Sequence, residues 1–259
     1  PRVFSSAASD VYKRQVEADA AAAQGVVVCN TPDAPSISTA EHTMSLLMSA
    51  SKFTANNVAR LRAGRQDFYA AHEGIELSGA TIGVVGHGRI GSRVARMCAA
   101  MDMRVIVCDP YVKVAEHEQV DLDVILTESR IITMHTPLTD ETRNLLDAAA
   151  FARMQDGVII INAARGGVID TQALVDALDS GKVYAAGLDV TAPEPLDPEH
   201  TLLNRDNVVV TPHIASATDK GRVRMYSGAI ENARQVLAGE RPVDCVNPHV
   251  YEVLEGRSS

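Results

Sequence analysis

The sequence of 259 residues predicts an α/β protein built on a doubly wound parallel sheet. Two observations lead to this fold class. Short runs rich in Val and Ile alternate with helical patterns along most of the chain, and one of these runs leads through a glycine-rich turn directly into a helix. Such alternation is typical of a parallel sheet with helices on both faces.

The first 15 residues, Pro1 to Gln15, have neither the apolar core of a signal peptide nor a periodic pattern that continues into the next segment. We expect them to be non-native sequence, with the genuine sequence starting near Val16, or else a natural disordered tail. The pattern is regular from Val16 onward. Residues 17–24 are expected to form an alanine-rich helix closed by Gly25, and residues 26–29 a short buried strand.

A loop rich in Pro, Ser and Asp follows at residues 30–38, and a long helix is expected from Thr39 to about Arg62. A helix of this length is open to two interpretations. It packs within its own chain, or it packs against a second copy in a homodimer.

The remaining elements follow the alternating pattern. Strands are expected at 81–85, 104–108, 131–135, 158–162, 184–189 and 207–210, and helices at 89–101, 148–154, 171–180 and 217–237. This part of the chain resembles a Rossmann-type nucleotide-binding domain in its order of elements.

The glycine-rich turn lies in the stretch TIGVVGHGRIG, Thr81 to Gly91. In a dinucleotide-binding turn, the first glycine, Gly86, allows the tight turn. Gly88 lets the backbone approach a pyrophosphate, and Gly91 lets the helix pack closely on the strand. The helix N-terminus then offers backbone N–H groups to the phosphates.

Asp109 ends the next strand, 18 residues after Gly91, where a ribose-binding acid is expected. A carboxylate there accepts hydrogen bonds from the ribose hydroxyls and repels a 2′-phosphate, which favours NAD over NADP. The alternative is an ordinary glycine turn followed by a solvated aspartate.

The composition excludes several classes of partner. With a net charge of −9 and no run of Lys or Arg, nucleic acid and anionic membranes are not expected to bind. No apolar stretch reaches the length of a membrane span. The four cysteines, Cys29, Cys98, Cys108 and Cys245, have no C-x-x-C spacing, so we expect reduced thiols in a cytoplasmic protein and no metal site.

Ligands of such sheets bind at the carboxyl ends of the strands, where Arg165, Glu194 and His213 follow predicted strands. An imidazole can exchange a proton with a substrate hydroxyl, a carboxylate can orient the imidazole, and an arginine can hold a substrate carboxylate. Together they suit redox chemistry on an alcohol or ketone. Taken singly, each has a plain structural alternative: a loop histidine, an exposed arginine or a rigid surface turn.

Five stretches, VVGHGRIGSRVA, MHTPLTDETRNLLD, INAARGGVID, AAGLDVTAPEPL and VVVTPHIASAT, resemble the successive motifs of the NAD-dependent D-2-hydroxyacid dehydrogenases. The resemblance runs from about Val16 to Val250. It implies that Arg165 binds the substrate carboxylate, Glu194 pairs with the histidine, and His213 is the acid/base.

The resemblance also implies an NAD site and a homodimer through the helix from Thr39. The implied cofactor-binding residues are Gly86, Gly88, Arg89, Ile90, Gly91, Asp109, His135, Thr136, Pro137, Ala163, Arg165, Asp189, His213 and Ala215.

The chain departs from the family pattern in three places. Thr191 stands where an aromatic residue is usual, and Phe68 or Tyr69 where a tryptophan is common. Family members also begin with a flavodoxin-like substrate-binding half, most of which we expect to be missing. We therefore expect an NAD-binding domain at 39–238 and a remnant of the substrate-binding domain at 16–38 and 239–259.

These features predict an oxidoreductase that transfers hydride between NAD and a D-2-hydroxyacid/2-oxoacid pair, with phosphoglycerate or glycerate/hydroxypyruvate as substrate. The fragment itself is expected to turn over poorly. The alternative is an NAD-binding corepressor that keeps the same scaffold and acts by binding other proteins.

Overall fold

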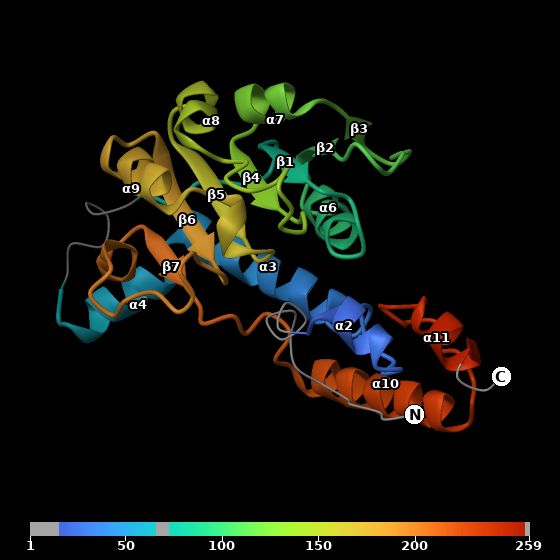
Figure 1. Ribbon diagram of the computed structural model, residues 1–259. Coiled ribbons are helices and arrows are strands. Elements are labelled where there is room, and N and C mark those ends of the chain that lie inside the picture. Colours follow the sequence, from blue (N-terminus) through green and yellow to red (C-terminus); the bar gives the residue numbers. More distant parts are fainter. Residues whose placement is uncertain (1–15, 66–72, 257–259) are drawn as a thin grey trace. The chain divides into compact units, whose positions relative to one another are not determined.

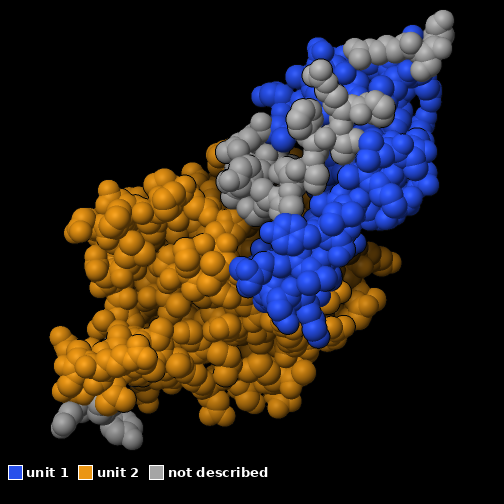
Figure 2. All heavy atoms as spheres, turned by 90° about the horizontal axis from the view of Figure 1, so that it is seen from below, with its two compact units in different colours: residues 1–36, 216–259 blue, residues 37–215 orange. Residues whose placement is uncertain are grey.

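The computed structural model describes residues 16–65 and 73–256. The chain divides into two compact units, coloured separately in Figure 2. The larger unit comprises residues 37–215, and the smaller one combines residues up to 36 with residues from 216 onward. Each unit has an apolar core of its own.

The larger unit is built on a seven-stranded sheet in the order β3-β2-β1-β4-β5-β6-β7 (Figure 1). Every neighbouring pair is parallel, which confirms the predicted doubly wound fold class. The chain moves outward from β1 to β3 and then crosses back to β4, so the strand order reverses between β1 and β4. The strands are β1 (Thr81–Val85), β2 (Arg104–Cys108), β3 (Glu118–Gln119), β4 (Ile131–Met134), β5 (Val158–Asn162), β6 (Val183–Leu188) and β7 (Val208–Val210).

Helices cover both faces of this sheet, because its central strands are apolar on both sides. In β5, Ile160 joins one core while Ile159 and Ile161 join the other, as the two-residue period of a strand requires. The first core lies under α7 (Leu122–Glu128), α8 (Ala148–Arg153) and α9 (Thr171–Asp179), and the second under α3 (Ser36–Lys52) and α6 (Gly91–Ala99).

The single helix predicted from Thr39 to Arg62 is wrong. The structure has α3, which begins at Ser36, and a separate α4 (Thr54–Arg62). The break is at Phe53, which has a left-handed φ of 51° and is only 2% exposed. Its ring packs edge-on against Tyr184 of β6 at a centroid distance of 5.4 Å. Burial of this aromatic ring offsets the cost of interrupting the helix.

The smaller unit contains α2 (Ala18–Ala23), α10 (Asp219–Leu237) and α11 (Val250–Gly256). Its core is formed by Ala22, Val27, Val236 and Val250. The strand expected at 26–29 is not formed as a regular element. Cys29 makes an isolated antiparallel bridge with Cys245 instead.

The side chain of Asn247 holds the N-terminal and C-terminal segments of this unit together. It is 1% exposed, accepts a hydrogen bond from the Val28 amide, and donates to the carbonyl oxygens of Ala18 and Val26. A buried amide that satisfies three backbone groups fixes the local register of both segments.

Helix α10 belongs to the smaller unit, whereas the sequence led us to place it at the end of the NAD-binding domain. Its Arg224 and Asn232 side chains donate hydrogen bonds to the carbonyl oxygens of Ala34 and Asn30. The functional division at 38/39 and 238/239 stays a prediction. Residues 1–15, Phe68 and Tyr69 lie outside the described residues.

Among the described residues, the sequence did not lead us to expect β3, α7, α11 or the two short 3-10 helices, Gly166–Val168 and Thr201–Asn204. Strand β3 has only two residues, both exposed, so it has no apolar pattern to detect. Within residues 16–65 and 73–256, no helix is long and apolar enough to cross a membrane.

Candidate active site

Every residue predicted for the site lies beyond the carboxyl end of a parallel strand, and therefore at one edge of the sheet. Gly86 to Gly91 follow β1, Asp109 follows β2, and His135 to Pro137 follow β4 (Figure 1). Ala163 and Arg165 follow β5, Asp189 follows β6, and His213 and Ala215 follow β7. Glu194 lies in the loop between β6 and β7.

The turn after β1 needs its glycines for close backbone contact. Gly86 has a φ of +92°, and a Cβ there would lie 2.7 Å from the carbonyl oxygen of His135. A Cβ on Gly91 would lie 2.0 Å from the carbonyl oxygen of Gly86, so α6 begins directly against the turn. A Cβ on Gly88, in contrast, would meet no atom within 4 Å. The turn thus leaves open space at the glycine expected to face a pyrophosphate.

Two polar atoms beside this turn fit a dinucleotide as partner. Thr136 Oγ1 and His87 Nε2 are buried but have no hydrogen-bond partner among the described residues. Burying such atoms without partners costs free energy, and a ligand with phosphate and hydroxyl groups could satisfy them. The residues present therefore fit the predicted NAD.

Asp109 has a structural role that the sequence did not reveal. Its Oδ2 accepts a hydrogen bond from the His87 amide at 2.7 Å, which ties the glycine turn to the end of β2. Its Oδ1 accepts from the amides of Tyr111 and Val112. Since a carboxylate has about four acceptor sites, it can still accept from a ribose hydroxyl.

Replacing Asp109 by alanine is expected to weaken NADH binding about 10- to 100-fold, because hydrogen bonds to a charged group contribute about 1.5–3 kcal/mol. NADPH binding is expected to weaken less. Both cofactors lose the support that Asp109 gives the glycine turn through the His87 amide, but only NADH loses a hydrogen bond to the ribose, and NADPH is relieved of repulsion at its 2′-phosphate. Fluorescence titration of both cofactors measures the difference. Asp179→Ala, which removes an exposed ion pair with Arg205, is the control. Equal weakening of NADH and NADPH binding would contradict a ribose contact.

His135 forms part of the wall against which the glycine turn packs. Its ring Nε2 lies 2.9 Å from Thr133 Oγ1. Burial lowers the pKa of His135 to about 3, so its imidazole is neutral at pH 7. It therefore contributes shape and hydrogen bonding rather than positive charge.

The backbone that carries Arg165 is fixed by Asn162, the last residue of β5. Asn162 is 1% exposed, its Oδ1 accepts from the Ala164 amide at 3.0 Å, and its Nδ2 donates to the Arg165 carbonyl at 2.9 Å. The Arg165 guanidinium donates to the Ala164 carbonyl. Burial lowers the pKa of Arg165, and the charge of Glu194 opposes that shift. The Arg165 and Glu194 side chains are thus close enough to interact.

Gly166 brings the loop of Arg165 against the loop of Glu194. A Cβ on Gly166 would lie 1.9 Å from the carbonyl oxygen of Thr191. Thr171, at the start of α9, also donates a hydrogen bond to the Ala192 carbonyl at 2.6 Å. The two loops therefore meet through backbone, and this contact requires a residue without a side chain.

Replacing Gly166 by alanine is expected to displace the 191–194 loop and to destabilise the chain by about 1–3 kcal/mol. The melting temperature should fall by roughly 2–4 °C for each kcal/mol. Gly256→Ala, at a position where a Cβ meets nothing within 4 Å, is the matched control. A melting temperature equal to that of the wild type would mean that the loop moves aside at no cost.

The structure brings His213 and Glu194 together, as the family resemblance implies. His213 Nδ1 lies 2.5 Å from Glu194 Oε1. The Glu194 side chain is 36% exposed and the His213 side chain 21%. A carboxylate at Nδ1 fixes the imidazole tautomer and leaves Nε2, on the opposite side of the ring, to contact a bound ligand.

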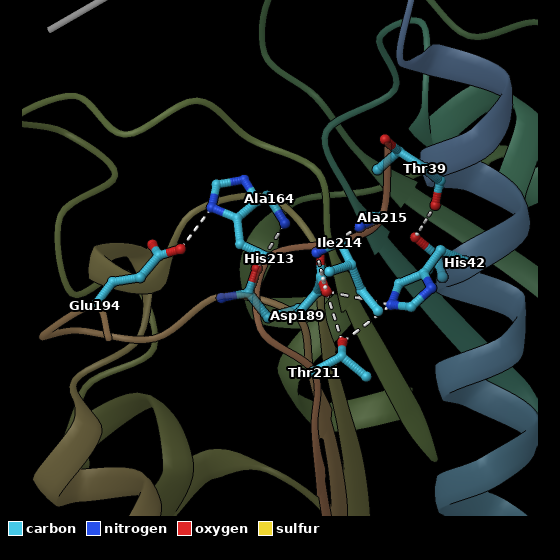
Figure 3. Close-up of polar contacts among 11 residues, drawn as sticks. Thr39, His42, Ala164, Asp189, Glu194, Thr211, His213, Ile214 and Ala215 are labelled. Atoms are coloured by element: carbon cyan, nitrogen blue, oxygen red, sulfur yellow. Dashed lines mark hydrogen bonds and ion pairs between the residues drawn. The ribbon is translucent and has the colours of Figure 1, made fainter. Parts of the chain in front are cut away.

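The backbone of His213 is held by Asp189, the residue after β6 (Figure 3). His213 has a left-handed φ of 53°, and its amide donates to the Asp189 carbonyl at 2.8 Å. The Asp189 carboxylate accepts from the amides of Ile214 and Ala215, both at 2.9 Å, and from the Thr211 hydroxyl at 2.6 Å. The loop from Thr211 to Ala215 thus wraps around one buried carboxylate.

His42 of α3 completes this network, although no sequence motif singled it out. Its Nε2 lies 3.0 Å from Thr211 Oγ1 and 3.3 Å from Asp189 Oδ1. Burial by itself raises the pKa of Asp189, but the hydrogen bonds from His42, Thr211, Ile214 and Ala215 outweigh it and hold that pKa below its ordinary value. Asp189 therefore stays ionised although it is only 1% exposed.

Taken together, the edge of the sheet carries a glycine turn that fits a dinucleotide, a half-buried arginine, and an imidazole paired with a carboxylate. Among the described residues, no group of three or more His, Cys, Asp and Glu side chains could hold a metal ion. The arrangement suits proton exchange with a carboxylate-bearing substrate next to a bound nucleotide.

Comparison with known proteins points to one family. Residues 44–215, which lie within the larger unit, match the sequence model of the D-isomer specific 2-hydroxyacid dehydrogenase, NAD binding domain. D-3-phosphoglycerate dehydrogenase of Archaeoglobus fulgidus is 42% identical over 215 residues, which cover 81% of this chain and 41% of that protein. Hydroxypyruvate reductase of Thermotoga maritima is 42% identical over 220 residues, covering 83% of this chain and 72% of that protein.

A similar solved structure is that of D-lactate dehydrogenase from Aquifex aeolicus complexed with NAD and lactic acid. Its TM-score is 0.78 and its sequence identity 31%, and the match covers 92% of this chain and 76% of that one. The chain spans about two fifths of the length of the phosphoglycerate dehydrogenase relative.

Proposed function

The chain belongs to the D-isomer specific 2-hydroxyacid dehydrogenases and carries their NAD-binding domain, and we propose that it takes part in hydride transfer between NAD and a D-2-hydroxyacid/2-oxoacid pair. The observation that carries the proposal is the 2.5 Å contact between His213 Nδ1 and Glu194 Oε1. It lies at the same edge of the sheet as the glycine turn and Arg165.

In the proposed reaction, His213 exchanges a proton with the substrate oxygen through Nε2. Protonated His213 gives its proton to the oxygen of a 2-oxoacid as that oxygen becomes a hydroxyl, and the neutral ring takes the proton back in the reverse direction. The carboxylate of Glu194 stabilises the protonated ring. NAD supplies or accepts the hydride, which no side chain can do.

Arg165 would bind the substrate carboxylate. A guanidinium can donate two parallel hydrogen bonds to a carboxylate and polarise the neighbouring carbonyl group. Partial burial, which lowers the pKa of Arg165, also strengthens such a pair because water screens it less.

The substrate class we favour is 3-phosphoglycerate or glycerate/hydroxypyruvate. Support comes from two relatives, a D-3-phosphoglycerate dehydrogenase and a hydroxypyruvate reductase, each 42% identical to this chain. We further propose that residues 16–38 and 239–259 form part of a flavodoxin-like substrate-binding domain, and that the protein is cytoplasmic.

A homodimer through α3 is also proposed. Ile37 and Met48 on this helix are 42% and 40% exposed, while Leu46 and Leu47 face the core of their own unit. Apolar side chains on the second face of an already packed helix suit contact with another copy. Sedimentation of the wild type and of Met48→Glu tests this: the variant should shift toward the monomer, and identical dimers would exclude this surface.

The proposed activity is tested with two proteins: the chain itself, and a chimera that joins Val16 to the N-terminal part of the Thermotoga maritima relative outside the match. Oxidation of NADH at 340 nm is followed with hydroxypyruvate, pyruvate, glyoxylate and 3-phosphohydroxypyruvate. We expect NADH to bind both proteins and the chimera to turn over at least one oxoacid. If both proteins bind NADH but neither turns over any of the oxoacids, the result would contradict the proposed dehydrogenase activity and favour the corepressor alternative.

A further inference from the structure

Two cysteines face each other in the smaller unit, at the antiparallel bridge between residues 29 and 245. Hydrogen bonds flank this pair on both sides: the Val246 amide donates to the Val28 carbonyl at 2.7 Å, and the Asn30 amide to the Asp244 carbonyl at 3.1 Å. Cys29 and Cys245 themselves exchange no backbone hydrogen bond. They therefore form the non-hydrogen-bonded type of antiparallel pair.

This type of pair has the spacing that a disulfide needs. Its Cα atoms are typically about 4.5 Å apart, with side chains close together on one face. Disulfides span Cα separations of about 4.4–6.8 Å. The Cys245 thiol also acts on Cys29 through a side-chain hydrogen bond, so the two sulfur atoms are already in contact range.

The surroundings hold the pair in register while leaving it partly accessible. Cys29 and Cys245 are both half-buried free thiols, whereas Cys98 is fully buried in a helix. The Asn247 side chain, two residues after Cys245, is hydrogen-bonded to the backbone of Val26 and Val28 next to Cys29. A small disulfide can thus approach a pair that the fold keeps aligned.

Charges around the pair determine how readily it reacts. Burial, then the neighbouring Cys245 and Asp244, raise the pKa of Cys29 to about 11. Tyr251 packs against the same small core as the two cysteines, and the guanidinium of Arg241 lies 4.7 Å from the centroid of its ring. Since the thiolate is the nucleophile, exchange at neutral pH is slow.

We propose that Cys29 and Cys245 form a reversible cross-strand disulfide by exchange with a low-molecular-weight disulfide such as oxidised glutathione. One protein thiolate attacks the small disulfide, forms a mixed disulfide and releases one glutathione thiolate. The second protein thiolate then attacks the protein-bound sulfur and releases the second glutathione. Two electrons pass from the protein thiols to the small disulfide, and each of the two glutathione thiolates that leave takes up one proton.

The bond would join residues 216 positions apart in the chain. It would link the segment after α2 covalently to the segment before α11, where the structure otherwise has two backbone hydrogen bonds and one asparagine side chain. The smaller unit would then open less readily, because the link limits the freedom of its unfolded state.

The test brings the purified chain to equilibrium in glutathione buffers of increasing oxidised fraction. Free thiols are then blocked with iodoacetamide, and tryptic peptides are examined without reduction. We expect the peptides carrying Cys29 and Cys245 to be cross-linked, and dithiothreitol to restore both free thiols. The proposal would be overturned if the cross-link does not form at equilibrium. It would equally be overturned if either cysteine carries glutathione as a stable mixed disulfide in place of the cross-link.

Two controls separate native geometry from chance pairing. In 8 M urea the short loop between Cys98 and Cys108 should close instead, since loop closure favours nearby residues. Cys29→Ser and Cys245→Ser should each abolish the cross-link in buffer, with circular dichroism reporting that the fold is retained. A native cross-link between any other pair of cysteines would also contradict the assignment.

Discussion

Replacing His213 by alanine is expected to lower the rate of 2-oxoacid reduction by about 10²- to 10⁴-fold, the usual contribution of a positioned acid/base. NADH should still bind with close to wild-type affinity, because the glycine turn and Asp109 are separate from the His213 side chain. The chimera described above is the protein to assay, with single-turnover NADH oxidation as the measurement.

Two further variants make this result specific. Glu194→Gln retains a hydrogen-bond acceptor for Nδ1 but removes the charge, so its activity should fall, though less than that of the alanine variant. His249→Ala changes an exposed histidine of the smaller unit and should leave the rate unchanged. Full turnover by His213→Ala would refute the assigned role.

Replacing Asp189 by alanine should have the largest effect on stability. The change leaves two backbone amides, the Thr211 hydroxyl and His42 without their common acceptor. With a cost of about 1–3 kcal/mol for each buried group left unpaired, we expect a loss of at least about 3 kcal/mol. Because these groups hold the His213 loop, activity should fall as well. Differential scanning calorimetry and the NADH assay measure the two effects.

Acid should reproduce part of this effect in the wild type. The pKa of Asp189 in the folded chain lies below its ordinary value of 3.8. Its contribution to stability is therefore complete above that value and is lost as pH falls through the folded pKa. Asp189→Asn should flatten this part of the pH–stability curve. Parallel curves for the two proteins would show that Asp189 is not the group responsible. Asp140→Ala, which changes a fully exposed acid 3.9 Å from Arg143, serves as the control.

The sheet could be predicted because its information is local. Runs such as Val158–Asn162 are apolar on both faces, and the three glycines of the first turn have steric roles that depend on their spacing. The position of Arg165, Glu194 and His213 at one edge then follows from the rule for parallel sheets. Their direct pairing does not follow, because strand ends fix an edge but not a side-chain contact.

What sequence reasoning missed depends on contacts between distant residues. Nothing near Phe53 predicts a break in the helix, since the cause is its ring packing on Tyr184 of β6. In the same way, the role of His42 depends on its contacts with Asp189 and Thr211, which are far from it in the chain. Asn162 has the sequence of an ordinary strand end, and its role lies in its hydrogen bonds to Ala164 and Arg165.

The contact between His42 and Thr211 joins residues 169 positions apart, which matters during synthesis. At about 5–20 residues per second, the ribosome needs on the order of ten seconds or more to add the partner of His42. Until β6 exists, Leu46 has no Gly187 to pack against. In the folded chain the two are so close that a Cβ on Gly187 would lie 3.0 Å from the Leu46 Cβ. Helix α3 therefore leaves the ribosome with part of its apolar face uncovered until β6 has been made.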